Sequence, residues 1–167
     1  MGTTIDYPNL TAYLYNDRKN NLCYNHGSQV VRALLEDDRA LTTLDLRGNR
    51  ISTPGIQALA QLLTKNTRLK SLCLEWNSLG DAESDISILT EALAINKTLT
   101  CLDLRNNQLS PKSGAYLAKM LSINSTLKTL DLRWNSIDDS AAIQMENSVK
   151  QNTSSSLQKV SLLEYIN

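Results

Sequence analysis

Phenylalanine is absent from this sequence, and histidine occurs once, as His26. Leucine and isoleucine must therefore supply most of the buried surface, which favours repeated, similar layers over an aromatic core. A Ser-His-Asp or Cys-His catalytic device would have to use His26, which lies next to Gly27 and is better explained by the entry of a helix. We therefore expect that the protein is not an enzyme and has no catalytic residues.

Cysteine is scarce and odd in number: Cys23, Cys73 and Cys101 form no Cys-x-x-Cys pair. This usage fits free thiols in a reducing compartment better than a secreted disulfide framework. The spacing also favours no metal site, so no metal and no cofactor are expected.

The sequence also lacks long apolar runs and an excess of charge of one sign. No stretch approaches the roughly eighteen apolar residues of a membrane span, and the N-terminus has no basic region followed by an apolar run. The 17 basic residues balance the 17 acidic ones, and no basic arm occurs. We expect a cytoplasmic protein that binds neither membrane nor nucleic acid.

One spacing, Leu-x-x-Leu-x-Leu-x-x-Asn-x-(Leu/Ile), recurs along the chain with a period of 28, 30 and then 28 residues. Such a period is typical of a solenoid. A partial unit begins at Leu157 and keeps Val160 and Leu162. The complete units start at Leu41, Leu69, Leu99 and Leu127.

The segment before the first repeat carries a weaker form of the pattern. Apolar or small residues lie one 28-residue step before their repeat counterparts, although the corresponding strand positions, Asn16 and Arg18, are polar. We therefore divide the chain into an N-terminal segment with a degenerate capping half-repeat, 1–40, and the repeats, 41–167. The matching residues are Cys23, Gly27, Val31 and Leu35.

Each unit changes period half-way. Its first half alternates, which predicts a short strand with the leucines buried, and its second half has helical spacing, as at Ile56, Leu59 and Leu63. An asparagine at the ninth place of each unit is expected to bond backbone groups where the chain turns inward, forming a stacked ladder. A second asparagine series at the helix ends is expected to adopt the left-handed conformation that stops a helix. The ladder residues are Asn49, Asn77, Asn107 and Asn135, and the helix-end residues are Asn66, Asn96, Asn124 and Asn152.

Units of this length with a full helix resemble the ribonuclease-inhibitor class of leucine-rich repeats over residues 27–167. Within that class, the blocks at 72–80 (LCLEWNSLG), 102–110 (LDLRNNQLS) and 130–137 (LDLRWNSI) are similar to the leucine-rich-repeat proteins of the centrosome linker and of cilia and flagella. The resemblance implies an α/β fold: a right-handed βα solenoid with parallel strands on the concave face and helices on the convex face.

Equivalent positions of successive repeats stack on the concave face of such a sheet. Both tryptophans occupy the eighth place of their repeats, and acidic and basic residues alternate at the fifth and seventh places. Two interpretations remain open: a solvated face whose charges neutralise one another, with each indole packed on its own turn, or a protein-binding face. The candidate partner-binding residues are Trp76, Trp134, Arg105, Arg133, Glu75, Arg47, Asp103 and Asp131.

These features predict a non-catalytic protein-interaction module, a scaffold or adaptor subunit of a cytoskeletal, centrosomal or axonemal assembly. Its partners are expected on the concave face and at the open C-terminal edge, where self-association is one way to cover the last strand. The alternative is a recognition subunit of a regulatory enzyme system: a ubiquitin-ligase receptor, a sensor fragment or a small-GTPase regulator. A literal ribonuclease inhibitor fits less well, because a basic ligand favours a strongly acidic concave face.

Overall fold

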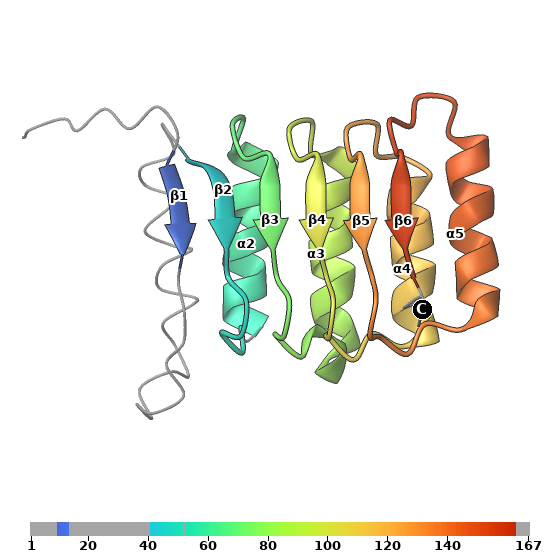
Figure 1. Cartoon of the computed structure of the whole chain (residues 1–167), viewed down its shortest axis with the longest axis horizontal. Coiled ribbons are helices and arrows are strands. Elements are labelled where there is room, and N and C mark those ends of the chain that lie inside the picture. The colour runs from blue at the N-terminus through green and yellow to red at the C-terminus, as the bar shows by residue number, and fades with distance from the viewer. Residues whose placement is uncertain (1–9, 14–40, 52, 163–167) are drawn as a thin grey trace, which may run out of the picture.

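The computed structural model describes residues 10–13, 41–51 and 53–162. Within these ranges, one parallel sheet of six strands runs in chain order from β1 to β6 (Figure 1). Neighbouring strands pair at equivalent repeat positions, so that Leu72 lies opposite Leu102, and Leu102 lies opposite Leu130. The strands are β1 Leu10–Tyr13, β2 Leu41–Asp45, β3 Ser71–Cys73, β4 Cys101–Asp103, β5 Thr129–Asp131 and β6 Lys159–Ser161.

A helix follows each strand from β2 to β5; in Figure 1, α2, α3 and α4 lie behind the sheet, and α5 lies to the right of β6. Because consecutive helices also pack against one another, they cover one face of the sheet and leave the other open. The predicted α/β leucine-rich-repeat solenoid is confirmed. No helix in the described ranges is both long and apolar enough to cross a bilayer. The helices are α2 Thr53–Lys65, α3 Glu83–Ile95, α4 Pro111–Leu121 and α5 Asp139–Gln151.

The leucines at the first, fourth and sixth places form the layers of the core. In the second repeat Leu69, Leu72 and Leu74 are completely buried, and their counterparts in the third and fourth repeats are nearly so. Each such side chain contributes about 1.5–3 kcal/mol through burial. The core is therefore a stack of similar leucine layers between the sheet and the helices, as the absence of phenylalanine requires.

Local sequence signals set where the helices begin. Ser110 caps α4 by accepting a hydrogen bond from the amide of Ser113, and Pro111 occupies the first helical position, where no amide donor is needed. Asp138 caps α5 through the amide of Ala141. The longer second unit places its extra residues in a short 3₁₀ helix, η1 Leu79–Asp81, ahead of α3.

The ninth-place asparagines hold the turns that follow the strands. The side chain of Asn107 donates to the carbonyls of Leu74 and Leu104, and its Oδ1 accepts from the amides of Asn77 and Leu79. Asn107 is fully buried, so no water can replace these bonds. Asn77 and Asn135 make equivalent bonds to the preceding repeat, which joins successive turns into one ladder.

The helix-end asparagines act differently from the prediction. Asn96 has φ −63° and ψ 135°, and none of this series has a positive φ, so the expected left-handed conformation is wrong. Instead the Asn96 Oδ1 accepts from the amides of Thr98 and Leu99, while its Nδ2 donates to the carbonyl of Leu63 in the preceding repeat. Asn124 makes the same arrangement. These residues form a second ladder between repeats, because an amide side chain can satisfy both the turn and the neighbouring helix end.

The N-terminal strand lies earlier than the 28-residue spacing places it. In the pairing of β1 with β2, Ala12 lies opposite Leu44, a position that the spacing assigns to Asn16. His26 lies outside the described residues. So do all the residues assigned to the expected half-repeat, which are Asn16, Arg18, Cys23, Gly27, Val31 and Leu35.

The C-terminal end of the described solenoid is only partly covered. Leu157, Val160 and Leu162 of the last unit are half-buried, whereas the same places in the preceding repeat are almost completely buried. The described part of the chain pairs β6 on one side only, with β5. Among residues 10–13, 41–51 and 53–162, therefore, nothing covers this apolar layer and strand edge completely.

Candidate functional site

The two tryptophans occupy turns with an unusual backbone. Trp76 has φ 61° and Trp134 has φ 58°, whereas the equivalent places of the other two complete repeats hold Gly48 and Asn106, also at positive φ. Glycine and asparagine adopt this left-handed conformation readily, but a bulky side chain makes it cost about 1 kcal/mol or more. The turn therefore does not favour tryptophan, and the repeat fold gives no reason for its presence.

Both indoles are largely exposed, at 56% for Trp76 and 43% for Trp134. The ring of Trp134 lies beside two guanidinium groups, with its centroid 5.5 Å from Cζ of Arg105 and 5.2 Å from Cζ of Arg133. Such cation–π contacts hold the indole in place. Trp134 thus packs on its own turn and on the preceding repeat, and yet both rings keep a broad apolar surface towards solvent.

Three arginines of the concave face, defined here as the strand face opposite the helices, pair with the aspartate two residues earlier. The Nη2 to Oδ2 distance is 2.8 Å from Arg47 to Asp45, and the same contact is 2.6 Å in the third repeat and 2.7 Å in the fourth. Residues two apart on a strand point to the same face, so each pair forms within its own repeat. The other two pairs are Arg105 with Asp103 and Arg133 with Asp131.

The second repeat departs from this charge pattern. It has Cys73 instead of aspartate at the fifth place and Glu75 instead of arginine at the seventh. Glu75 is buried between two arginines: its Oε2 lies 3.0 Å from Nη2 of Arg105 and 3.8 Å from Nη1 of Arg47. Its Oε1 accepts a hydrogen bond from Nδ2 of Asn106. Glu75 thus lies between the positive charges of Arg47 and Arg105, which occupy the seventh place of the first and third repeats.

Arg105 connects this cluster to the next repeat, because its Nε also lies 3.7 Å from Oδ2 of Asp131. The charged candidates predicted from the sequence therefore form one continuous network across four strands. Exposed ion pairs contribute little, about 0–1 kcal/mol each, so the network positions side chains more than it stabilises the fold.

Hydrogen bonding to Asp45 and to Asp103 raises the pKa of Arg47 and of Arg105, respectively. Burial opposes ionisation of Asp45 and Asp131, but the bonds donated by Arg47 and Arg133 outweigh it and lower the pKa of both carboxyls. Asp45 and Asp131 therefore stay ionised at neutral pH. The stabilisation that their ion pairs provide is lost as the pH falls through the lowered pKa values of these two carboxyls.

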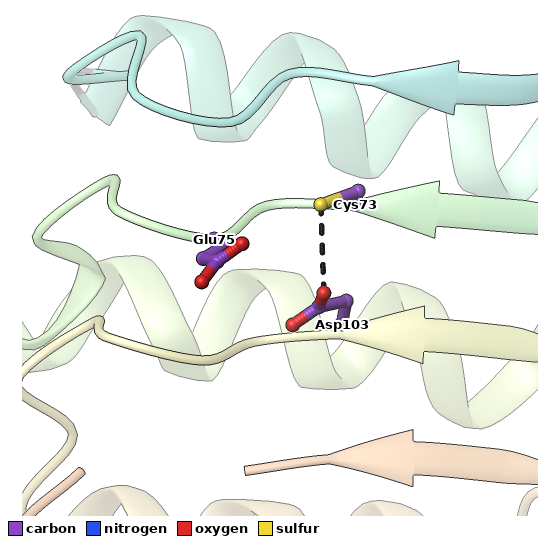
Figure 2. A group of neighbouring side chains, drawn as sticks. All are labelled: Cys73, Glu75 and Asp103. Atoms are coloured by element: carbon purple, nitrogen blue, oxygen red, sulfur yellow. Dashed lines mark hydrogen bonds between the residues drawn. The ribbon is translucent and has the colours of Figure 1, made fainter. Parts of the chain in front are cut away.

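Cys73, Glu75 and Asp103 lie together on this face, with their nearest sulfur and oxygen atoms within 4.8 Å of one another (Figure 2). The thiol of Cys73 donates to Oδ2 of Asp103 at 3.6 Å. The geometry approaches that of three metal ligands, but Arg105 already bonds both carboxylates, and a metal would have to displace its charge. Burial also raises the pKa of Cys73 to about 12, which keeps the thiol protonated, whereas a metal requires the thiolate. These groups serve the ion-pair network better than they would serve a metal.

Cys73 is therefore expected to react slowly with iodoacetamide. At pH 9 its alkylation is expected to be at least about tenfold slower than that of glutathione, because only the thiolate attacks. The rate should still be rising at about pH 10, where the rate of an ordinary thiol has levelled off. Mass spectrometry of the tryptic peptides resolves Cys73 from Cys101, which is also a free thiol. A rate that levels off near pH 8.5, as for an ordinary thiol, would contradict the buried environment.

The strain at Trp76 gives a second prediction. Replacing Trp76 by asparagine, the residue found at the same place in the third repeat, is expected to raise the free energy of unfolding by about 0.5 kcal/mol. Urea unfolding followed by circular dichroism measures this change. Ile95→Asn is the matched control, because Ile95 is equally exposed, at 59%, but ends a helix and has no left-handed backbone. Destabilisation by Trp76→Asn as large as that of the control would show that the turn does not strain the tryptophan.

Some surface features were not predicted from the sequence. Asn106 bonds Glu75 within the network, a contact that only the stacking of repeats creates. On the helical side, Ile95, Ile123 and Ile143 are exposed, and the first two occupy equivalent places in consecutive repeats. Helical spacing alone could have indicated the isoleucines, since they lie off the buried stripe.

Comparison with known proteins agrees with this geometry. The family model described as "Leucine Rich repeat" matches residues 39–60, 96–118 and 124–144. Leucine-rich repeat-containing protein 45 of Gallus gallus is 46% identical over 76 residues, which is 46% of this chain and 11% of that protein. Ribonuclease inhibitor of Sus scrofa is 39% identical over 83 residues, or 47% of this chain and 17% of that protein. The repeats of this chain are leucine-rich repeats of the ribonuclease-inhibitor-like class.

These leucine-rich repeats match less than a fifth of the length of either relative. A solved structure, "Leiomodin-1 Actin-Binding Site 2 (ABS2)", superimposes with a TM-score of 0.65 over 86% of this chain and 80% of that chain, at 20% identity. At that identity the likeness establishes the fold alone. Leucine-rich-repeat folds generally form non-catalytic surfaces for protein interaction.

Proposed function

We propose that this chain is a non-catalytic module that binds another protein through the concave face. The observation that carries the proposal is that two largely exposed tryptophans are held in strained turns beside a rigid sheet. Interfaces concentrate tryptophan and arginine in their central anchors, and strained positions are retained where function requires them. The proposed anchors are Trp76, Trp134, Arg105 and Arg133, flanked by Arg47, Glu75, Asp103 and Asp131.

The role that we propose for this module is that of a scaffold or adaptor subunit in a cytoskeletal, centrosomal or axonemal assembly of the cytoplasm. The resemblance of the 72–80, 102–110 and 130–137 blocks to centrosomal and ciliary leucine-rich-repeat proteins supports this assignment.

A second contact is proposed at the open C-terminal edge. Its half-buried residues Leu157, Val160 and Leu162 and the edge of β6 favour coverage by a neighbouring chain or by a second copy of this one. Sedimentation velocity over a wide range of protein concentration tests self-association. A chain that remains monomeric throughout, and is equally stable when it ends at Gln151, would argue against this contact.

The concave-face proposal is tested by quantitative affinity capture from cell extract. The double variant Trp76→Asn, Trp134→Asn keeps residues that accept the left-handed turn while it removes both indoles. Each anchor is expected to contribute about 2 kcal/mol, so the specific partner should be depleted at least about thirtyfold relative to the wild type.

Ile95→Asn serves as the control bait, because it removes an equally exposed apolar side chain from the helical side. It should retain the partner, and circular dichroism should show all three baits folded. If the double variant and the wild type retain the same proteins in equal amounts, the concave face is not the binding site.

A further inference from the structure

Two of the three Asp–Arg pairs of the concave face expose the arginine clearly more than the aspartate. The side chain of Arg47 is 44% exposed and that of its partner Asp45 is 12% exposed, and Arg133 is likewise more exposed than Asp131, at 33% against 24%. The carboxylates lie close to the sheet, and the guanidinium groups lie above them. A partner that approaches this face therefore meets the guanidinium groups of Arg47 and Arg133 first, whereas Arg105 and Asp103 are about equally exposed, at 21% and 18%.

The carboxylates of the patch also have less free hydrogen-bonding capacity than the guanidinium groups. Both carboxylate oxygens of Asp45 accept from Arg47, and both of Glu75 accept, one from Arg105 and one from Asn106. Asp103 and Asp131 are occupied in the same way by the arginines of their own repeats.

The arginines, in contrast, keep donors in reserve. A guanidinium group carries five N–H donors. Within the described residues, Arg105 and Arg133 use only Nε and Nη2, and Nη1 of Arg47 makes only the 3.8 Å contact with Glu75. The patch therefore offers free hydrogen-bond donors to a ligand, while every carboxylate oxygen in it already accepts at least one hydrogen bond.

The apolar part of the patch lies beside these donors. Trp134 contacts both Arg105 and Arg133, and Trp76 occupies the same place two repeats earlier, with Asn106 between them. Successive strands are about 4.8 Å apart, so the two tryptophan positions are separated by roughly 10 Å. A ligand that spans them must combine apolar contact with a hydrogen-bond acceptor.

We propose that the concave face binds an acidic protein segment, in which an aspartate or glutamate adjoins a large apolar side chain. This inference rests on the proposed function and specifies its partner. The carboxylate would bond Nη1 of Arg133 and Arg105, and the apolar side chain would pack against Trp76 and Trp134. Charge-assisted bonds of this kind are among the strong ones in proteins.

The charge of the patch favours a protein segment over a polyanion. Its three arginines are outnumbered by Asp45, Glu75, Asp103 and Asp131, so the net local charge is not positive. Nucleic acids and anionic lipid surfaces require an excess of positive charge to neutralise a row of phosphates. One carboxylate on an apolar segment requires only the free donors that this face has.

The first test measures the local preference for anions. The chain contains only two tryptophans, so their fluorescence reports on this patch alone. At constant ionic strength, the ratio of iodide quenching to caesium quenching is expected to be higher than the ratio for free N-acetyltryptophanamide, which corrects for the intrinsically greater efficiency of iodide. Arg133→Gln should weaken iodide quenching, whereas Lys97→Gln, which removes an exposed cation outside the patch, should not. A ratio equal to or lower than that of N-acetyltryptophanamide would overturn the preference for an acidic ligand.

The second test selects peptides from a random phage-displayed library on the intact chain. The selected sequences are expected to place aspartate or glutamate next to a large apolar residue, and Arg133→Gln should weaken their binding by about tenfold. A basic consensus whose binding still needs both tryptophans would overturn this inference and leave the proposed function standing. Selection of no peptide that depends on Trp76 and Trp134 would count against both. Tighter binding of a DNA oligonucleotide or of phosphatidylserine vesicles than of any peptide would replace the protein segment by a polyanion.

Discussion

Replacing Asn107 by alanine is expected to lower the free energy of unfolding by at least about 3 kcal/mol. This side chain donates to three carbonyls and accepts from two amides, and it is fully buried. Its removal leaves backbone groups of two repeats without partners and without access to water. A domain with an ordinary free energy of unfolding, about 5–15 kcal/mol, would lose a large part of that free energy.

Urea unfolding followed by circular dichroism measures this loss, and Asn106→Gly is the matched control. Asn106 is the neighbouring residue and has a φ of 53°, which glycine adopts without strain. Its side chain makes one bond to Glu75, so the control should change stability by no more than about 1 kcal/mol. Equal stabilities of the two variants would mean that the asparagine ladder does not hold the turns in place.

The consequence of the Asn107 variant extends to the candidate site. The amide of Asn77, which immediately follows Trp76, donates to Oδ1 of Asn107. The asparagine ladder thus fixes the backbone that presents the tryptophans, and weakening it should disorder the patch as well as the core. A partial loss of ordered structure in this variant would therefore also reduce partner binding.

The repeat architecture was predictable because its signals are independent of distant contacts. Leucines at fixed places set the layers, and alternation followed by helical spacing set the order of strand and helix. The same regularity misplaced the N-terminal strand, and the helix-end asparagines were also misinterpreted, because a residue such as Asn96 at a helix end is usually explained by the local backbone. Its real partner, the carbonyl of Leu63, lies in the preceding repeat and cannot be recognised from local sequence.

The candidate site, too, was predictable only in part. Sequence spacing placed the tryptophans and the charged residues on one face, but it could not decide which charges lie uppermost. That order depends on side-chain geometry: each arginine reaches over the shorter aspartate two residues earlier, and Glu75 is enclosed by two arginines. The left-handed backbone at Trp76 was not predicted either. The only sequence signal for it was that Gly48 and Asn106 occupy the same place in other repeats.

Replacing Gly80 by alanine is the second substitution with a large expected effect. A Cβ at this position would lie 2.0 Å from the carbonyl oxygen of Gln108 and 3.0 Å from that of Asn107. Both atoms belong to the backbone of the next repeat, and the Gly80 amide already donates to the Asn107 carbonyl at 2.8 Å. Because backbone held by the asparagine ladder cannot move aside easily, we expect the free energy of unfolding to fall by about 3 kcal/mol.

Gly48→Ala separates this steric effect from the intrinsic flexibility of glycine. Gly48 has a φ of 69° and no atom within 4 Å of an added Cβ, so its substitution should cost only about 1 kcal/mol of backbone strain. Gly80, in contrast, has no positive φ, and alanine there suffers only from the clash. Urea unfolding of the two variants compares the mechanisms directly. If Gly80→Ala proved no more destabilising than Gly48→Ala, the second and third repeats would be packed more loosely than the distances indicate, and the rigid presentation of Trp76 would lose its support.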